Sequence, residues 1–394
     1  MPELMKMMLR SLLVLTLILA PGAGYAAPDD PEHQQATREM LRAMRIIDMT
    51  RVGFRKVVAD KMELKEIIMY ADKHVSDEEL LDVYVPVYAR HVSTAEARKA
   101  SAAFRNKDTQ LALDMAVRQI RNGPAVSTRM TPAQRIALET FNRSPWGKWF
   151  VDLAGRVSQD SARALQVWMA DYHTALFMSG LRGVAQHTQA YAATDRKTAP
   201  TAYFPDIVGV SYIDATNLLV AESTAAILKA EWQLDTDLDV LGIEKLLDAA
   251  TLSSPQKVVA ARLTLEQIDA KVEAYIANSD LGLKKTIADL RMIEMPAKDV
   301  FHRGLQIGFE RRLDWSVRFA ENQRAILDVI RRILVFADAR KNKISLQDGK
   351  MLFETDADVA LFKALVAEAQ SEDAKGERLR AEAMQRVMDI ANGK

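Results

Sequence analysis

Helix-capping sequences recur through the first half of the chain, and they constrain its fold more than any other feature. Thr131-Pro-Ala-Gln134 is a capping box with proline at the first helical position, and Ser144-Pro145 repeats the cap further along. Comparable boxes begin at Ser76 and Ser93. Such caps, four within about seventy residues, predict short helices joined by tight turns.

The helix predicted after Ser144 carries one apolar stripe, whose spacing is helical from Trp146 as far as Leu176. Gly180 and Gly183 follow, and we expect the helix to end before them. Aromatic residues are concentrated on this stripe. Core packing is the simplest explanation of such a face, but an exposed part of it would form a groove for an apolar ligand or a partner helix. The candidate groove residues are Trp146, Trp149, Phe150, Trp168 and Tyr172.

Two parts of the first half share one layout. When Phe104 is placed over Phe141, each phenylalanine is preceded by a capped amphipathic helix and followed by a polar turn and another helix. This layout predicts tandem α-hairpin repeats over about residues 76–120 and 131–180. The alternative is that capped helices resemble one another without being repeats.

Short motifs surround the predicted turns of both helix pairs. They are Tyr88-Ala-Arg-His91, Ser93-Thr-Ala-Glu96, Thr131-Pro-Ala-Gln134 and Phe141-Asn-Arg-Ser144-Pro145-Trp-Gly147. Their order resembles an uncharacterised family of exported bacterial helical domains, whose members read Y-A-K-x-F/L-T-x-E-E-L and then F-Y-x-S-P-x-G. The second pair keeps F-x-x-S-P-x-G, whereas Asn106-Lys107-Asp108 replaces the S-P step in the first. The resemblance covers about residues 42–177 and implies an exported helical domain without an assigned activity.

Residues 1–26 have the layout of a signal peptide. Lys6 and Arg10 precede a short apolar run, Ser11 to Ala20, and small residues at Gly24 and Ala26 predict cleavage after Ala26. The run is too short for a stop-transfer helix, although an uncleaved N-terminal anchor is the alternative. The chain has no cysteine, which excludes lipidation at the cleavage site, disulfides and thiol chemistry. We therefore expect an exported, periplasmic protein with no transmembrane segment after cleavage.

Charge is balanced over the whole chain. Lysine plus arginine and aspartate plus glutamate both number 53, so the totals give no reason to expect nucleic-acid binding. The hydrophobic content of 49% is enough to build real cores from 394 residues.

A polar segment with two prolines, residues 185–208, is the best candidate for a domain boundary. It would act as a linker between a helical repeat domain at residues 27–184 and a second domain at residues 209–394. The alternative is a surface loop within one domain.

Long helices are predicted for the second half. An apolar residue recurs every seven positions from Leu313 to Leu334, which favours an elongated antiparallel bundle or a coiled-coil arm. The helix that contains them either runs unbroken or kinks near Gly304 or Gly308, whose G-x-x-x-G spacing indicates close helix packing. The predicted helices cover Ser211–Trp232, Leu238–Leu252, Pro255–Ala277, Leu281–Ile293 and Pro296 to about Ala339.

One β element breaks this pattern. Ile344–Gln347 and Lys350–Phe353 flank Asp348-Gly349, a sequence typical of a type I′ hairpin turn. The charge-rich segment from Ser371 contains Gly376 and is predicted to be a frayed helix. The predicted fold is therefore all-α: a domain of short-helix repeats, then an elongated antiparallel bundle or coiled-coil-like domain with one small hairpin at about 344–353.

No motif of known chemistry stands out. The histidines lack metal-ligand spacing, and His74 and His91 are the pair that neighbouring short helices would best bring together. No nucleophile elbow or phosphate-binding loop occurs, so we assign no catalytic residue, metal or cofactor. The sequence favours a non-enzymatic scaffold or chaperone-like envelope factor that binds a protein partner or self-associates through its long helices. The alternatives are an envelope hydrolase with scattered carboxylate or histidine residues and a carrier of an apolar ligand.

Overall fold

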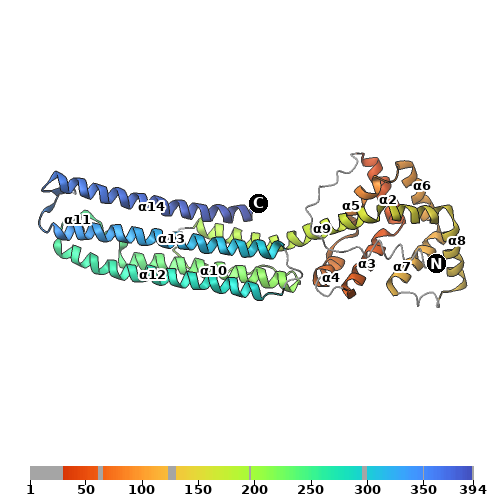
Figure 1. Cartoon of the computed structure of the whole chain (residues 1–394), viewed down its shortest axis with the longest axis horizontal. Coiled ribbons are helices and arrows are strands. Elements are labelled where there is room, and N and C mark those ends of the chain that lie inside the picture. Colours follow the sequence, from red (N-terminus) through yellow and green to blue (C-terminus); the bar gives the residue numbers. More distant parts are fainter. Residues whose placement is uncertain are drawn as a thin grey trace. The chain divides into compact units, whose positions relative to one another are not determined.

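The computed structural model describes residues 30–60, 65–122, 130–194, 197–294, 300–348 and 350–392. The predicted signal peptide, residues 1–26, lies outside the described residues. Helices form most of the described chain, and the strands in it belong to one two-stranded antiparallel sheet (Figure 1). The predicted all-α fold with a small hairpin is thus confirmed. The chain divides into two compact units, unit 1 up to Ala175 and unit 2 from Leu176.

Unit 1 is built from short helices whose caps form as predicted. The Ser76 hydroxyl accepts a hydrogen bond from the Glu79 N–H at 3.2 Å, and the Glu79 carboxylate accepts one from the Ser76 N–H at 2.8 Å. Ser93 and Thr131 form the same reciprocal box. The elements of unit 1 are α2 (Pro31–Ala43), α3 (Ile46–Asp60), α4 (Lys65–His74), α5 (Asp77–Ala89), α6 (Thr94–Phe104), α7 (Lys107–Asn122), α8 (Pro132–Arg143) and the first part of α9 (Pro145–Ala192).

The two phenylalanines that align the predicted repeats pack against each other. Phe104, the last residue of α6, is fully buried, and its ring lies edge-to-face with Phe141 of α8 at 5.9 Å between centroids. Phe150 of α9 lies 5.7 Å from the Phe104 ring. These rings join α6, α8 and α9 in one aromatic core, which fixes the α9 residues that line the pocket described below.

Helix α9 continues beyond the point where its glycines were expected to end it. Gly180 and Gly183 lie inside the helix, which runs to Ala192. A Cβ at Gly180 would collide with the Asn217 side chain, and one at Gly183 would collide with the Tyr203 ring. Both glycines therefore admit a neighbouring side chain instead of stopping the helix. As a result, residues 185–192 of the predicted linker are helical, and the two units divide at Ala175, not within residues 185–208.

Helices α10 (Ser211–Leu241) and α12 (Pro255–Met292) of unit 2 are longer than predicted from the sequence. Breaks are predicted after Trp232 and after Ala277, but α10 and α12 continue through these positions. No proline interrupts either helix, and in α10 the side chains of Leu234, Leu238 and Leu241 pack on the core. Gly242, with φ of 72°, ends α10 in the left-handed conformation. The helices are α10 (Ser211–Leu241), η3 (Ile243–Lys245), α11 (Ala249–Leu252), α12 (Pro255–Met292), α13 (Val300–Ala339) and α14 (Asp356–Ala391).

Helices α12 and α13 pack side by side and antiparallel (Figure 1). The predicted seven-residue repeat lies in this interface, where Leu327 and Leu334 are buried in the same apolar cluster as Leu265 of α12. From Val300 to Ala339, α13 is one helix. A Cβ added at Gly304 or at Gly308 would meet no atom within 4 Å, so the expectation of close packing there is wrong.

A second seven-residue repeat, absent from the sequence-based prediction, joins α13 to α14. On α13 the intervals alternate between four and three, and on α14 the same intervals run from Phe362 to Leu379. Phe336 packs on Phe362 at 6.0 Å, while Trp315 Nε1 donates a hydrogen bond to the Leu379 carbonyl oxygen. The segment from Ser371 is therefore a paired helix, not a frayed one. The α13 positions are Trp315, Phe319, Asn322, Ile326, Val329, Ile333, Phe336 and Arg340.

The hairpin forms in the predicted register. Strands β1 (Ile344–Gln347) and β2 (Lys350–Phe353) pair with Ile344 opposite Phe353, and Asp348 has φ of 49°. Gly349 lies outside the described residues. Ile344 is buried, and the Phe353 ring lies 5.2 Å from Phe362 of α14. The hairpin thus packs on the helices of unit 2, which supplies the support that an isolated hairpin lacks.

Candidate ligand pocket

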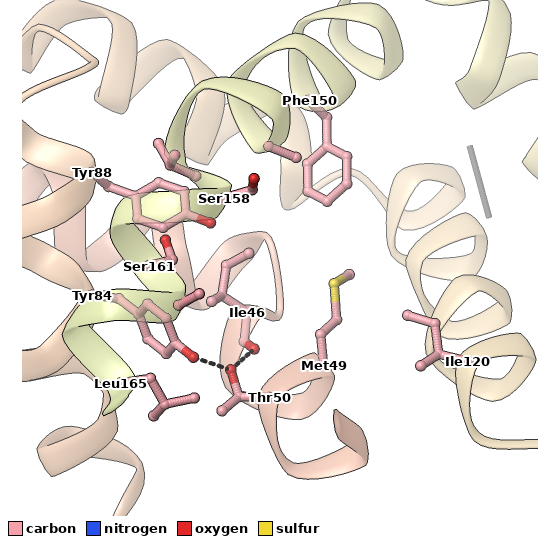
Figure 2. Close-up of a pocket in the computed structure, with 13 residues that line it drawn as sticks. Ile46, Met49, Thr50, Tyr84, Tyr88, Ile120, Phe150, Ser158, Ser161 and Leu165 are labelled. Carbon is pink, nitrogen blue, oxygen red and sulfur yellow. Dashed lines mark hydrogen bonds between the residues drawn. The ribbon is translucent and has the colours of Figure 1, made fainter. Parts of the chain in front are cut away.

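A pocket with a volume of about 120 Å³ lies inside unit 1 (Figure 2). Its walls come from α3, α5, α7 and α9. The apolar part consists of Ile46 and Met49 from α3, Ile120 from α7, and a face of α9 on which large residues alternate with small ones. The residues of that α9 face are Phe150, Ala154, Val157, Ala162 and Leu165. The alanines leave room between the larger side chains.

Hydroxyl groups form the polar part of the lining. They belong to Thr50, Tyr84, Tyr88, Ser158 and Ser161. In Figure 2, Tyr88 and Ser161 lie on one side of the pocket, across from Ile120. Among the described residues that line the pocket, none carries a carboxylate, an amine, a guanidinium or an imidazole.

The hydroxyl groups of Thr50 and Tyr84 form a hydrogen bond with each other. The Thr50 hydroxyl lies 2.9 Å from the Ile46 carbonyl oxygen and 2.9 Å from the Tyr84 hydroxyl oxygen. Thr50 has one hydroxyl hydrogen, and the Ile46 carbonyl can only accept, so Tyr84 is the donor in the second bond. Burial raises the pKa of Tyr84 to about 12. Tyr84 is therefore a neutral phenol whose hydrogen is already used.

Tyr88 and Ser161 have fewer protein partners. The Ser161 oxygen is buried and makes no hydrogen bond of regular geometry. Burial, and secondarily the neighbouring Tyr84, raise the pKa of Tyr88, while the nearby Ser161 hydroxyl opposes that rise. Both groups are thus neutral hydroxyls that meet each other, across the gap between α5 and α9, at the pocket wall.

The candidate groove residues split into two clusters in the structure. Trp146, Trp149 and Phe150 pack around Phe104, with ring centroids between 5.7 and 6.3 Å from it. Of the five residues, Phe150 lines the pocket, and it is buried. Trp146 and Trp149 are half-buried, and the buried Phe150 connects this cluster with the pocket.

The second cluster lies between α4 and α9. Trp168 stacks on Tyr172 at 5.2 Å, Tyr172 lies 6.4 Å from Tyr70, and Tyr70 stacks on His74 at 4.2 Å. Burial raises the pKa of Tyr172 to about 12. Trp168 and Tyr172 are half-buried, and the structure does not join them with Trp146 and Trp149 in one groove.

Four residues of the lining, Tyr84, Tyr88, Ser158 and Ser161, are not among the predicted site residues. In the sequence, Tyr84 is an apolar position of the helix predicted after Ser76. Tyr88 is the first residue of the Tyr88-Ala-Arg-His91 motif. The serines sit within the apolar stripe of α9, where small and hydroxyl residues alternate with Phe150 and Leu165. That alternation is a usable signal, because small residues on a buried face leave space unless a neighbouring helix fills it.

The histidines do not gather into a metal site in the described structure. His74 stacks on Tyr70, whereas His91 lies 3.6 Å from a carboxylate oxygen of Asp160. No group of three or more histidine, aspartate or glutamate side chains within the described ranges is placed to hold a metal ion. None of the helices described is both long and apolar enough to cross a bilayer. Comparison with protein families, with curated proteins and with solved structures finds no significant match for the chain.

Proposed function

We propose that this chain is an exported, non-catalytic binding protein whose unit 1 takes up a small, neutral, largely apolar ligand. The observation that carries the proposal is the pocket of about 120 Å³, with apolar side chains on most of its wall and hydroxyls at one side. Such a lining is typical of small-molecule sites. Export rests on the signal-peptide layout of residues 1–26 and on the resemblance to exported helical domains.

The pocket volume sets the size of the ligand. A cavity of about 150 Å³ lined by apolar residues in another protein binds benzene. The pocket of about 120 Å³ is similar in size, so we expect a single ring with at most a short substituent, about eight non-hydrogen atoms. At roughly 0.6 kcal/mol per atom the binding free energy is about 5 kcal/mol, which corresponds to a Kd on the order of 0.2 mM.

The chemistry of the lining supports binding over hydrolysis. A serine or tyrosine hydroxyl needs a base nearby to become a nucleophile. The described lining offers Ser158, Ser161 and Tyr88 without such a base, and the raised pKa of Tyr88 keeps its phenol protonated. A charged ligand is disfavoured too, because the lining holds no counter-charge to offset its desolvation.

Methionine-methyl NMR tests the proposal. Met49 lines the pocket and Met388 lies on α14 of unit 2, so the two methyl groups report on the site and on a control in the other unit. Titration of the full chain with ethylbenzene and with acetophenone is expected to shift the Met49 signal saturably and to leave Met388 unchanged.

A matched pair of variants places the binding in the pocket. Ala162→Leu fills the lining and should abolish the Met49 shift, whereas Ala102→Leu changes an exposed position of α6 and should preserve it. The absence of a saturable shift with either probe, up to millimolar concentrations, would overturn the proposal.

Self-association or partner binding through unit 2 is a second candidate function. The observation that favours it is the outer face of α12, where Val259, Leu263 and Leu281 are 48%, 59% and 68% exposed. Sedimentation velocity over increasing concentration, with Val259→Glu/Leu263→Glu as the comparison, tests it. A chain that sediments as a monomer throughout would remove the self-association candidate.

A further inference from the structure

We infer that the ligand of unit 1 carries a hydrogen-bond acceptor of the carbonyl type, such as a ketone, aldehyde or ester, on its apolar ring. This inference rests on the proposed function and concerns the same pocket. It follows from the way in which the hydroxyl hydrogens of the lining are used.

The five hydroxyls of the lining contain one hydrogen each. Thr50 donates its hydrogen to the Ile46 carbonyl oxygen, and Tyr84 donates to Thr50. Ser161 makes no hydrogen bond of regular geometry, and the hydroxyl that it meets is that of Tyr88. Even if one donates to the other, the second hydrogen has no acceptor from this pair. The polar wall therefore offers at least one donor that the protein leaves unused.

A ligand without an acceptor leaves that donor buried and unpaired. An unmade hydrogen bond in a water-excluded site costs more than a made one gains. A carbonyl oxygen accepts from one or two hydroxyls and carries no charge, so it satisfies the donors without the desolvation penalty of a carboxylate. The donors also lie on two helices, Tyr88 on α5 and Ser161 on α9, so one carbonyl oxygen placed between them can accept from both (Figure 2).

The ionisation state of the wall supports the same ligand class. Burial raises the pKa of Tyr88, so its phenol keeps its hydrogen throughout the physiological range. Ser161 does not ionise in this range. The wall therefore acts as a donor at every pH at which the protein works.

Acetophenone and ethylbenzene are matched probes because they differ chiefly in the carbonyl group. The Met49 methyl titration of the full chain should give a Kd for acetophenone about five- to tenfold lower than for ethylbenzene. The double variant Ser161→Ala/Tyr88→Phe, which removes both donors, should bring that ratio to within about twofold, while ethylbenzene binding stays the same or tightens. Ser179→Ala, a matched change on α9 outside the pocket, should leave the ratio unaltered. Benzoate, which has the same ring with a charge, should not bind.

The possible outcomes separate the inference from the proposed function. Equal affinities for acetophenone and ethylbenzene in the unmodified chain would overturn the acceptor inference and leave the ligand-binding function standing. A preference for acetophenone that persists in Ser161→Ala/Tyr88→Phe would also overturn the inference, because the donor would then lie elsewhere. Failure of both probes to bind would overturn the proposed function and, with it, the inference.

Discussion

Asn322 of α13 occupies the space that a side chain at Gly376 of α14 would need: a Cβ on Gly376 would lie 2.7 Å from Asn322 Oδ1. The Asn322 amide cannot simply turn away, because its Nδ2 donates a hydrogen bond to the Glu372 carbonyl oxygen at 2.8 Å. Asn322 is buried, and it stands in the middle of the second seven-residue repeat. A polar residue at such a position fixes the register of paired helices.

Gly376→Ala should therefore destabilise unit 2, although alanine is the better helix former. The gain in helix propensity, about 1 kcal/mol, is outweighed by the displacement of the anchored amide, for a net loss of about 1 kcal/mol. Gly304→Ala is the matched control on α13, since open space surrounds it, and it should gain about 0.5–1 kcal/mol. Urea unfolding of both variants measures the difference. Equal stabilisation by the two substitutions would show that Asn322 does not constrain Gly376.

The stability of the α13–α14 pair should fall in acid. Arg340 Nε donates to Asp358 at 2.5 Å, and this hydrogen bond lowers the pKa of the Asp358 carboxyl below its usual 3.8. A carboxyl whose folded pKa is depressed stabilises the fold above its unfolded pKa, and the contribution disappears as the pH falls through the folded value. Asp358→Asn should lower Tm at neutral pH and converge with the unmodified chain as the pH falls below the depressed pKa of Asp358. Asp373→Asn, an exposed change on the same helix, should show no such convergence.

The parts of the fold that depend on interactions between residues close in sequence could be predicted. Capping boxes at Ser76, Ser93 and Thr131 satisfy backbone groups within four residues, so they form whatever surrounds them. The Asp348-Gly349 hairpin is local in the same sense. The roles of Gly180 and Gly376 could not be predicted in this way, because the side chains that pack on them, Asn217 and Asn322, are distant in sequence.

The pocket was beyond prediction for a related reason. Its lining comes from α3, α5, α7 and α9. The pocket exists because the small side chains of Ala154 and Ala162 leave a space that the facing helices do not fill. The aromatic residues of the α9 stripe could be identified, and Phe150 does reach the pocket. The division of that stripe into two aromatic clusters depends on Phe104 and Tyr70, which periodicity alone does not connect with it.

Unit 1 should lose stability in alkali before its buried tyrosines ionise. Burial raises the pKa of Tyr84 to about 12, above its usual 10.0. Between these values the unfolded chain releases a proton that the folded chain keeps, so the free energy of unfolding falls as the pH rises. Tyr84→Phe removes one such contribution and should make the loss between about pH 9 and pH 11 less steep, at a cost of about 1 kcal/mol at neutral pH for the Thr50 hydrogen bond. Urea unfolding at the two pH values measures both effects. A slope as steep in the variant as in the unmodified chain would contradict the assignment.

Two glycines of α9 should respond in opposite ways to the same substitution. A Cβ at Gly147 would collide with the Phe141 carbonyl oxygen, a backbone atom of α8 that cannot move without shifting the helix, whereas nothing lies within 4 Å of one at Gly155. The Gly147 N–H also donates to the Ser144 hydroxyl at 2.9 Å, which fixes the start of α9 against the end of α8. Gly147→Ala should therefore cost about 2–3 kcal/mol, and Gly155→Ala should add about 0.5–1 kcal/mol. Because both changes lie in one helix and remove the same backbone freedom from the unfolded chain, the difference between their urea midpoints isolates the contact with Phe141. A small or absent difference would mean that the glycine of the F-x-x-S-P-x-G motif serves something other than the close approach of α8 and α9.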